Sequence, residues 1–223
     1  MNKAYKIVRS YTLAQKTKLL GKAEGKLLEI GSGTGELLAN CEKKGWECQG
    51  VEPEEVARKA AFQNHSLKLL ASIDELSIQE NSLDRIMLWH VLEHVPNLHQ
   101  IIEKFKGWLK KDGLLFVAVP NHKSWDAKHY KENWAAYDVP RHLYHFDKES
   151  MNKLFGQHAL EIKQTRAMLF DSFYISMLSE EIKSGQKKMI KGAIAGLISN
   201  LSATLKSGEY SSHLYLIGHK KAV

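Results

Sequence analysis

Three glycines and one carboxylate are spaced in a way that could bind a nucleoside. Gly31, Gly33 and Gly35 follow the apolar run at residues 26–30 and precede a stretch of helical periodicity. Glycine permits positive φ and lets the backbone approach a ligand closely. Glu52 lies 21 residues after Gly31, where a carboxylate can accept both hydroxyls of an adenosyl ribose. A tight turn beside a solvent-facing acid is the alternative that needs no ligand.

The glycine spacing separates two kinds of nucleoside ligand. The loop reads GxGxG, and position 36, where a dinucleotide-binding GxGxxG has its third glycine, is Glu. Glu36 would lie where a pyrophosphate needs positive potential. A further carboxylate, Glu29, precedes the loop. An adenosine ligand that lacks phosphates and carries a positive centre fits better than NAD, and S-adenosyl-L-methionine (SAM) is such a ligand. An NAD-dependent oxidoreductase is the alternative enzyme class.

At this point the chain resembles the class I SAM-dependent methyltransferases. LEIGSGTG (28–35) is similar to their first motif and GVEP (50–53) to their second. Residues 71–76 are expected to supply the adenine contact through Ser72, Ile73 or Asp74, and packing of Ile73 on the ring is favoured. The resemblance implies that these motifs contact SAM through Glu29, Gly31, Ser32, Gly33, Gly35, Glu52 and Pro53.

A second motif follows the fourth expected strand. LDRIMLWHVLEHVPN (83–97) resembles the D-x-I-x-x-x-x-V-L-E-H-V motif of the group that includes ubiquinone-type O-methyltransferases. Trp89 and His90 fall at the carboxyl end of the strand, where open α/β sheets bind ligands, and are expected to line the pocket near the methionine moiety. Packing by Trp89 and a structural role for Glu93 and His94 are the alternatives. Relatives that hold a divalent ion here use Glu-x-x-Glu-His. His90 replaces the first glutamate, so no metal is expected.

Polar groups are concentrated again in DVPRHLYHF (138–146). Similar W…D-x-P-R-H-L-x-H-F stretches occur in one subgroup of these methyltransferases, so the resemblance extends through residue 146. Arg141 is a rigid donor fork for a carboxylate or phosphate. Arg141 and His142 are therefore expected in the acceptor site. Internal pairing of Arg141 with Asp138 or Glu132 is the alternative.

Methyl transfer to oxygen calls for a base of near-neutral pKa, and histidine is the usual one. The candidate bases are His90 and His94 after the fourth strand and His122, His129, His142 and His145 in the first insertion. His90, His142 and Arg141 form the favoured catalytic set. His145 is the weaker candidate for a site residue. Phe146 is expected in the core, and Asp147 is expected to be the N-cap of the next helix.

The elements that must position these residues alternate between strand and helix through residue 120. Continuous apolar strands of this kind indicate a parallel sheet covered on both faces. Together with the resemblance, this pattern predicts an α/β, Rossmann-like, seven-stranded and mostly parallel sheet, with an antiparallel last strand and helices on both faces. The resemblance also implies a single domain, 1–223, in which the insertions 121–146 and 172–207 cover the acceptor site. The expected strands are 26–30, 47–53, 67–72, 83–91, 114–120, 160–169 and 213–221.

The second insertion contains an amphipathic helix, with a long expected helical stretch at 172–206. Apolar residues recur every three or four positions over 187–207, and lysines cluster at its start. A lid packed on the domain is the favoured interpretation. A dimer contact and a membrane-surface helix are the alternatives.

Composition narrows the partners and the compartment. Net charge is +7 over 223 residues, which permits nucleic acid, an anionic membrane surface or an acidic substrate. No nucleic acid is expected. Strand four ends in LWHV rather than in the Asn-Pro-Pro-Tyr with which methyltransferases of base amino groups act on a flipped base. Two cysteines without metal-type spacing, no signal peptide and no apolar span predict a cytoplasmic protein. The favoured function is SAM-dependent methylation of a small-molecule or lipid-linked acceptor at oxygen. A SAM-binding regulator without catalysis is the alternative.

Overall fold

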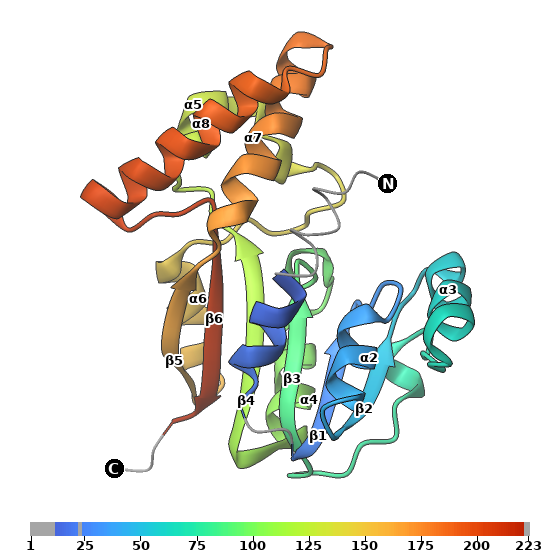
Figure 1. The fold of residues 1–223 in the computed structure, drawn as a ribbon. Coiled ribbons are helices and arrows are strands. Elements are labelled where there is room, and N and C mark those ends of the chain that lie inside the picture. Colours follow the sequence, from blue (N-terminus) through green and yellow to red (C-terminus); the bar gives the residue numbers. More distant parts are fainter. Residues whose placement is uncertain (1–11, 22–23, 221–223) are drawn as a thin grey trace. The chain divides into compact units, whose positions relative to one another are not determined.

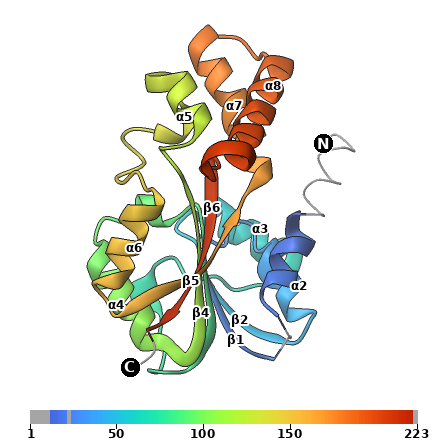
Figure 2. The ribbon, with the colours of Figure 1, turned by 90° about the vertical axis from the view of Figure 1, so that its left-hand side faces the viewer.

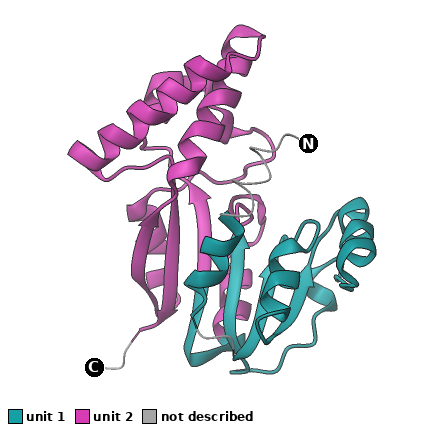
Figure 3. Ribbon diagram, in the orientation of Figure 1, with its two compact units in different colours: residues 1–88, 107–115 teal, residues 89–106, 116–223 magenta. Residues whose placement is uncertain are grey.

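A computed structural model of the chain describes residues 12–21 and 24–220. The chain crosses between two units, which Figure 3 shows in different colours. Unit 1 comprises residues 1–88 and 107–115, and unit 2 comprises residues 89–106 and 116–223. The strand order is β2-β1-β3-β4-β6-β5, and β4 contributes residues to both units.

Unit 1 is built on parallel strands, with β1 paired in parallel to both β2 and β3. Leu27, Leu28 and Ile86 are fully buried in these strands, as expected for a parallel sheet covered on both faces. Residues 12–19 form a helix. The other elements that begin in residues 24–88 of this unit are β1 (Gly25–Ile30), α2 (Glu36–Glu42), β2 (Trp46–Val51), α3 (Glu55–His65), the 3-10 helix η1 (Ile73–Glu75) and β3 (Leu83–Trp89).

Unit 2 contains β5 and β6, which pair antiparallel with Ile162 opposite Ile217. This confirms the prediction that the last strand is antiparallel. The remaining elements are η2 (Leu92–His94), α4 (Leu98–Trp108), β4 (Leu109–Pro120), α5 (Trp125–Tyr130), η3 (Lys131–Asn133), η4 (Ala135–Tyr137), α6 (Lys148–Gly156), β5 (Leu160–Ala167), α7 (Leu169–Ser184), α8 (Met189–Ser202), the π-helix η5 (Ala203–Ser207) and β6 (Ser212–His219).

The prediction of seven strands is wrong for the described residues, whose sheet has six. The strand expected at 67–72 is reduced to one bridge, in which Leu70 lies beside Val51 of β2. The N–H of Leu70 donates to the carbonyl of Gly50 at 3.0 Å, and the N–H of Glu52 donates to the carbonyl of Leu70 at 2.9 Å. Only Leu67 of this segment is buried, so little apolar area holds a longer ladder in place.

The single helical stretch expected at 172–206 is two helices, α7 and α8. Gly185 ends α7 with φ +67°, a left-handed conformation that favours glycine and terminates helices. The strand expected at 114–120 begins earlier, at Leu109. Two local predictions are confirmed: Asp147 is the N-cap of α6, with a capping box to Ser150, and Phe146 is buried.

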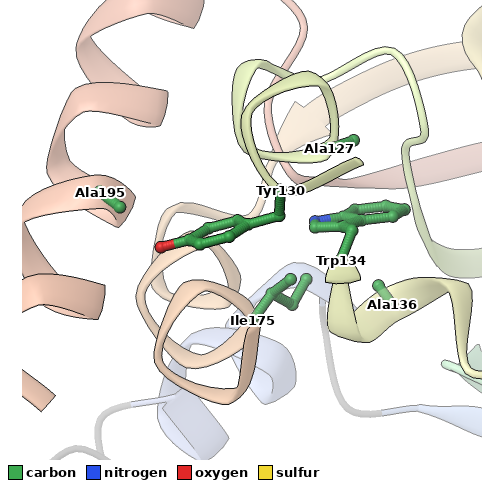
Figure 4. Packing of buried hydrophobic residues seen from close by; sticks show 6 residues of the cluster. All are labelled: Ala127, Tyr130, Trp134, Ala136, Ile175 and Ala195. Carbon is green, nitrogen blue, oxygen red and sulfur yellow. The ribbon is translucent and has the colours of Figure 1, made fainter. Parts of the chain in front are cut away.

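The two insertions share one hydrophobic core. Tyr130 and Trp134 from the first insertion pack with Ile175 of α7 and Ala195 of α8 (Figure 4). The buried carboxylate of Asp126 accepts hydrogen bonds from the Trp134 indole at 2.8 Å and from the hydroxyls of Ser199 and Ser211 at 2.7 Å each, and the bond from Ser199 joins the two insertions.

The helices α5, α7 and α8 lie together at the end of β6 where the chain enters that strand (Figures 1 and 2). The insertions therefore form one helical subdomain of unit 2. None of the helices in the described ranges has the length and apolar character needed to cross a bilayer.

Candidate functional site

The glycine loop of unit 1 turns sharply between β1 and α2. Gly31, Gly33 and Gly35 have φ of +75°, +54° and +76°. The N–H groups of Gly31 and Ser32 donate to the carbonyl of Val51, which ties the loop to the end of β2. At Gly35 a Cβ would lie 2.8 Å from Cδ1 of Leu67 and 3.1 Å from Cβ of Ala61 in α3, so close packing adds to the preference for glycine that the positive φ sets.

Glu52 is held by this loop. Its Oε2 accepts a hydrogen bond from the N–H of Gly33 at 2.7 Å, and its Oε1 accepts one from the N–H of Glu54 at 3.0 Å. The guanidinium of Arg58 donates to the carbonyls of Glu52 and Pro53 at 2.7 and 2.6 Å. A carboxylate offers about four acceptor positions. Two remain for the paired hydroxyls of a ribose.

Glu29 is a buried carboxyl in β1, only 4% exposed. Its Oε2 has no hydrogen-bond partner among the described residues. Burial raises the pKa of Glu29 to about 8, an effect that Lys16 opposes and Glu52 reinforces. An unsatisfied buried carboxyl is costly unless a cation or donor approaches it. The residues of unit 1 therefore fit a ligand with a ribose and a positive charge, as SAM has.

The segment expected to contact adenine lies beside Glu52 in unit 1. The bridge at Leu70 brings the following residues next to the end of β2. Ser72 is the N-cap of η1, because its hydroxyl accepts a hydrogen bond from the N–H of Asp74 at 3.2 Å. Ser72 and Ile73 are half-buried and Pro53 is exposed, so each has surface available for a ligand.

His90 in unit 2 has an unusual backbone and a charged environment. Its φ is +54°, which costs a non-glycine residue about 1–3 kcal/mol and suggests a functional constraint. Its Nε2 lies 3.0 Å from Oδ2 of Asp171 in α7, and its Nδ1 lies 3.6 Å from Oε1 of Glu93. Burial lowers the pKa of His90, but the carboxylates of Asp171 and Glu93 more than offset this and raise it to about 10.

His90 is therefore an imidazolium at neutral pH in this arrangement. In that state it can donate a hydrogen bond or stabilise negative charge, and it has no lone pair with which to accept a proton. Trp89 precedes it at the end of β3 and is half-buried.

His142 has the opposite character. Its Nδ1 lies 2.8 Å from the carbonyl oxygen of Ala136, which can only accept, so Nδ1 carries the proton and Nε2 presents a lone pair. Burial lowers the pKa of His142, with smaller opposing contributions from the Ala136 carbonyl and Glu93. The neutral form therefore prevails at pH 7. This tautomer is suited to accept a proton at Nε2.

Arg141 lies beside His142 but points outward. Its guanidinium is 77% exposed and donates to Oδ1 of Asp138 at 2.7 and 3.1 Å. The pairing with Asp138 that the sequence left open is thus present. His145 is exposed as well, with Nε2 2.9 Å from the carbonyl oxygen of Tyr137. Of the polar side chains in 138–146, His142 is the one that approaches the buried Glu93.

Three of these groups could hold a metal ion. Ligand atoms of Glu93, His94 and His142 lie within 4.8 Å of one another. His94 Nδ1 donates to the carbonyl oxygen of Arg141 at 2.9 Å, which leaves Nε2 as its ligand atom. Two imidazoles and a carboxylate are donors that transition metals accept. That no metal binds stays a prediction.

Two further residues near these groups were not identified from the sequence. Asp171 pairs with His90 from 81 positions away, and nothing near either residue signals it. Gly50 in β2 leaves room for the glycine loop, since a Cβ there would lie 2.5 Å from the Ser32 hydroxyl. Its position two residues before Glu52 in GVEP could have indicated a close approach.

The raised pKa of Glu29 predicts that the affinity for SAM depends on pH. A bound cation favours the charged carboxylate, so we expect SAM affinity to fall roughly tenfold per pH unit below about pH 8. In Glu29→Gln, binding should be weaker and lose this slope. Titration calorimetry from about pH 6 to about pH 8 measures both.

The unliganded protein provides the matching control. Because the folded-state pKa of about 8 exceeds the ordinary value of 4.5, the native state binds the extra proton between these values. Stability without SAM should therefore decline as pH rises through this window, and the Gln variant should not show this decline. Parallel pH profiles of wild type and variant would contradict the assignment.

Comparison with known proteins identifies a family for this chain. A family model described as a methyltransferase domain matches residues 5–165. A ubiquinone biosynthesis O-methyltransferase of Glaesserella parasuis is 34% identical over 117 residues, covering 46% of this chain and 47% of that protein. An (S)-coclaurine N-methyltransferase of Thalictrum flavum is 38% identical over 78 residues, covering 35% and 21%.

The fold also has solved counterparts. A SAM-dependent methyltransferase from Archaeoglobus fulgidus superposes with a TM-score of 0.61 at 20% identity, covering 94% of this chain and 93% of that one. At this identity the likeness concerns the fold. The chain spans about half the length, or less, of the two curated relatives named above.

Proposed function

The chain belongs to the methyltransferase domain family, and we propose that it transfers a methyl group from SAM to the oxygen of a small-molecule or lipid-linked acceptor. The observation that carries the proposal is the 2.7 Å hydrogen bond from the N–H of Gly33 to Glu52. Through this bond the GxGxG loop orients the carboxylate that would bind the ribose of SAM. Buried Glu29 adds a partner for a cation.

SAM supplies a sulfonium-activated methyl carbon when it is bound, so the protein needs to position the acceptor and remove its proton. We propose that Nε2 of His142 takes up the proton of the acceptor hydroxyl, while the Nδ1–H of the same ring donates to the carbonyl of Ala136. His90, as an imidazolium between Asp171 and Glu93, stabilises developing negative charge on the acceptor. A positioned base contributes about 10²–10⁴-fold to such a step.

We further propose that residues 1–223 act as one methyltransferase domain, with the insertions 121–146 and 172–207 as the cover of the acceptor site. Their common core around Tyr130 and Trp134 supports a joint role. The His90–Asp171 ion pair supports it too, because it joins the strand end to the first turn of α7.

Methylation at oxygen is supported by the neutral histidine and by the ubiquinone-type relative, which is an O-methyltransferase by name. Titration calorimetry with SAM, S-adenosylhomocysteine and NAD tests the cofactor. Transfer of labelled methyl to panels of phenols, amines and carbon acids tests the reaction. Binding of NAD without either adenosyl compound would refute the proposal. Binding of SAM without transfer to any panel would favour a regulator.

Substitution of Arg141 tests acceptor binding separately from SAM binding. Its exposed guanidinium is free to exchange Asp138 for an anionic group of the acceptor. We expect Arg141→Ala to raise the acceptor KM about tenfold while SAM affinity stays unchanged. Arg166→Ala, which removes an exposed arginine bound to Gln164 in β5, is the matched control and should change neither. Equal loss of SAM binding and acceptor use in a folded Arg141→Ala protein would contradict this division.

A further inference from the structure

A stripe of large apolar side chains is exposed on α8. Ile190, Ile194, Leu197 and Leu201 are 80%, 54%, 50% and 50% exposed. They recur at i, i+4, i+7 and i+11, so they share one face of the helix. Leu205 in η5 continues the series and is exposed as well. Contiguous exposed apolar surface of this kind marks a binding face. We call these five residues the α8 stripe.

The opposite face of α8 is made of small residues that pack closely on α7. A Cβ on Gly192 would lie 2.5 Å from Cα of Met177, and one on Gly196 would lie 2.7 Å from Cα of Phe173. Backbone contact this close fixes the rotation of α8 on α7, which lie side by side in Figures 1 and 2. The α8 stripe therefore cannot turn inward without breaking the hairpin.

Positive charge is concentrated in the segment of the chain that carries the α8 stripe. Residues 182–208 contain no Asp or Glu. Their five lysines are exposed, and Lys191 also pairs with Glu180 at 3.2 Å. A second copy docked on the same face would bring two such lysine sets together, which disfavours self-association. An anionic surface with an apolar interior matches both properties. The lysines are Lys183, Lys187, Lys188, Lys191 and Lys206.

We propose that the α8 stripe docks on an anionic phospholipid bilayer, with α8 lying in the plane of the interface. The apolar side chains enter the boundary between headgroups and acyl chains, and the lysines contact the phosphates. This docking does not depend on the transfer reaction. Its occupant is the lipid surface itself, whatever acceptor the enzyme uses.

The test is co-sedimentation of the full chain with vesicles of phosphatidylglycerol and phosphatidylcholine in equal amounts, and with pure phosphatidylcholine. We expect binding to the mixed vesicles that weakens with added salt, and weak binding to pure phosphatidylcholine. Lys187→Gln/Lys188→Gln should reduce the partition coefficient about 30-fold, since each lysine near an anionic surface contributes about fivefold. Ile194→Gln/Leu197→Gln should reduce it at least ~10-fold.

Val56→Gln/Phe62→Gln provides the matched control, because both residues are exposed apolar side chains of α3 in unit 1. This variant should bind vesicles as wild type does. Circular dichroism and light scattering accompany each variant. Equal binding to both vesicle types, or equal loss in the control, would overturn the proposal. So would a stable dimer in solution that Ile194→Gln/Leu197→Gln dissociates, since the stripe would then serve a second copy.

Discussion

Replacing Glu52 by alanine should weaken SAM binding about 100-fold while the unliganded protein stays folded. Hydrogen bonds to a charged group contribute about 1.5–3 kcal/mol each, and a ribose presents two hydroxyls to this carboxylate. The N–H groups of Gly33 and Glu54 aim the carboxylate before any ligand arrives. The carboxylate is therefore already ordered in the free protein, and SAM binding loses little side-chain entropy. Most of the free energy of the ribose hydrogen bonds then contributes to the affinity.

Titration calorimetry measures this loss, and Glu52→Gln separates charge from shape. Glutamine keeps one acceptor oxygen and should lose less affinity than alanine. The matched control is Glu54→Ala, which keeps the backbone N–H that donates to Glu52 and removes a side chain without a capping hydrogen bond. It should bind SAM normally. If Glu52→Ala retained wild-type affinity, the carboxylate would not contact the ribose.

Replacing His142 by glutamine should lower kcat about 10²–10⁴-fold with SAM affinity unchanged. Glutamine can still donate to the Ala136 carbonyl, but it cannot take a proton at the position of Nε2. Burial lowers the pKa of His142 below the ordinary histidine value of 6.5. The wild-type rate should therefore be flat near pH 7 and fall at lower pH as the imidazole is protonated. The variant should lose this acid limb.

His145→Gln is the control for this experiment. It alters an exposed histidine of the same segment, bound to Tyr137, and should leave both the rate and the pH profile intact. Chelator treatment adds a second arm, because a metal at Glu93, His94 and His142 would occupy the proposed base. Full activity after chelation agrees with proton transfer to His142. Loss of activity, restored by one divalent ion, would replace the base by a metal centre.

Features that depend on neighbours in the chain follow from the sequence. The turn at Gly31–Gly35 and the strand before it arise from local φ requirements and a continuous apolar run. The N-cap at Asp147 depends on Ser150, three positions away. The spacing of Glu52 after the loop needs only the length of one strand-helix-strand unit. Their geometry was therefore predictable, whereas their roles stay proposals.

Features that depend on packing could not be predicted in the same way. Residues 67–72 read as a strand because they are apolar, yet only Leu70 finds a partner on β2. Residues 172–206 read as one helix because their periodicity continues across Gly185, which the structure places in the left-handed conformation. The contact of α7 with α8 through Gly192 and Gly196 exists only once the hairpin has formed.

The sequence by itself predicted the methyl donor, because the GxGxG spacing with Glu52 favours an adenosyl ligand without phosphates and LEIGSGTG and GVEP resemble methyltransferase motifs. Only the tertiary structure decided the state of its histidines. His90 is charged because Asp171 reaches it from α7, and His142 is neutral because it is buried with its Nδ1–H on the Ala136 carbonyl. A pKa depends on the charges and burial around a group. For these two residues, long-range folding supplies both.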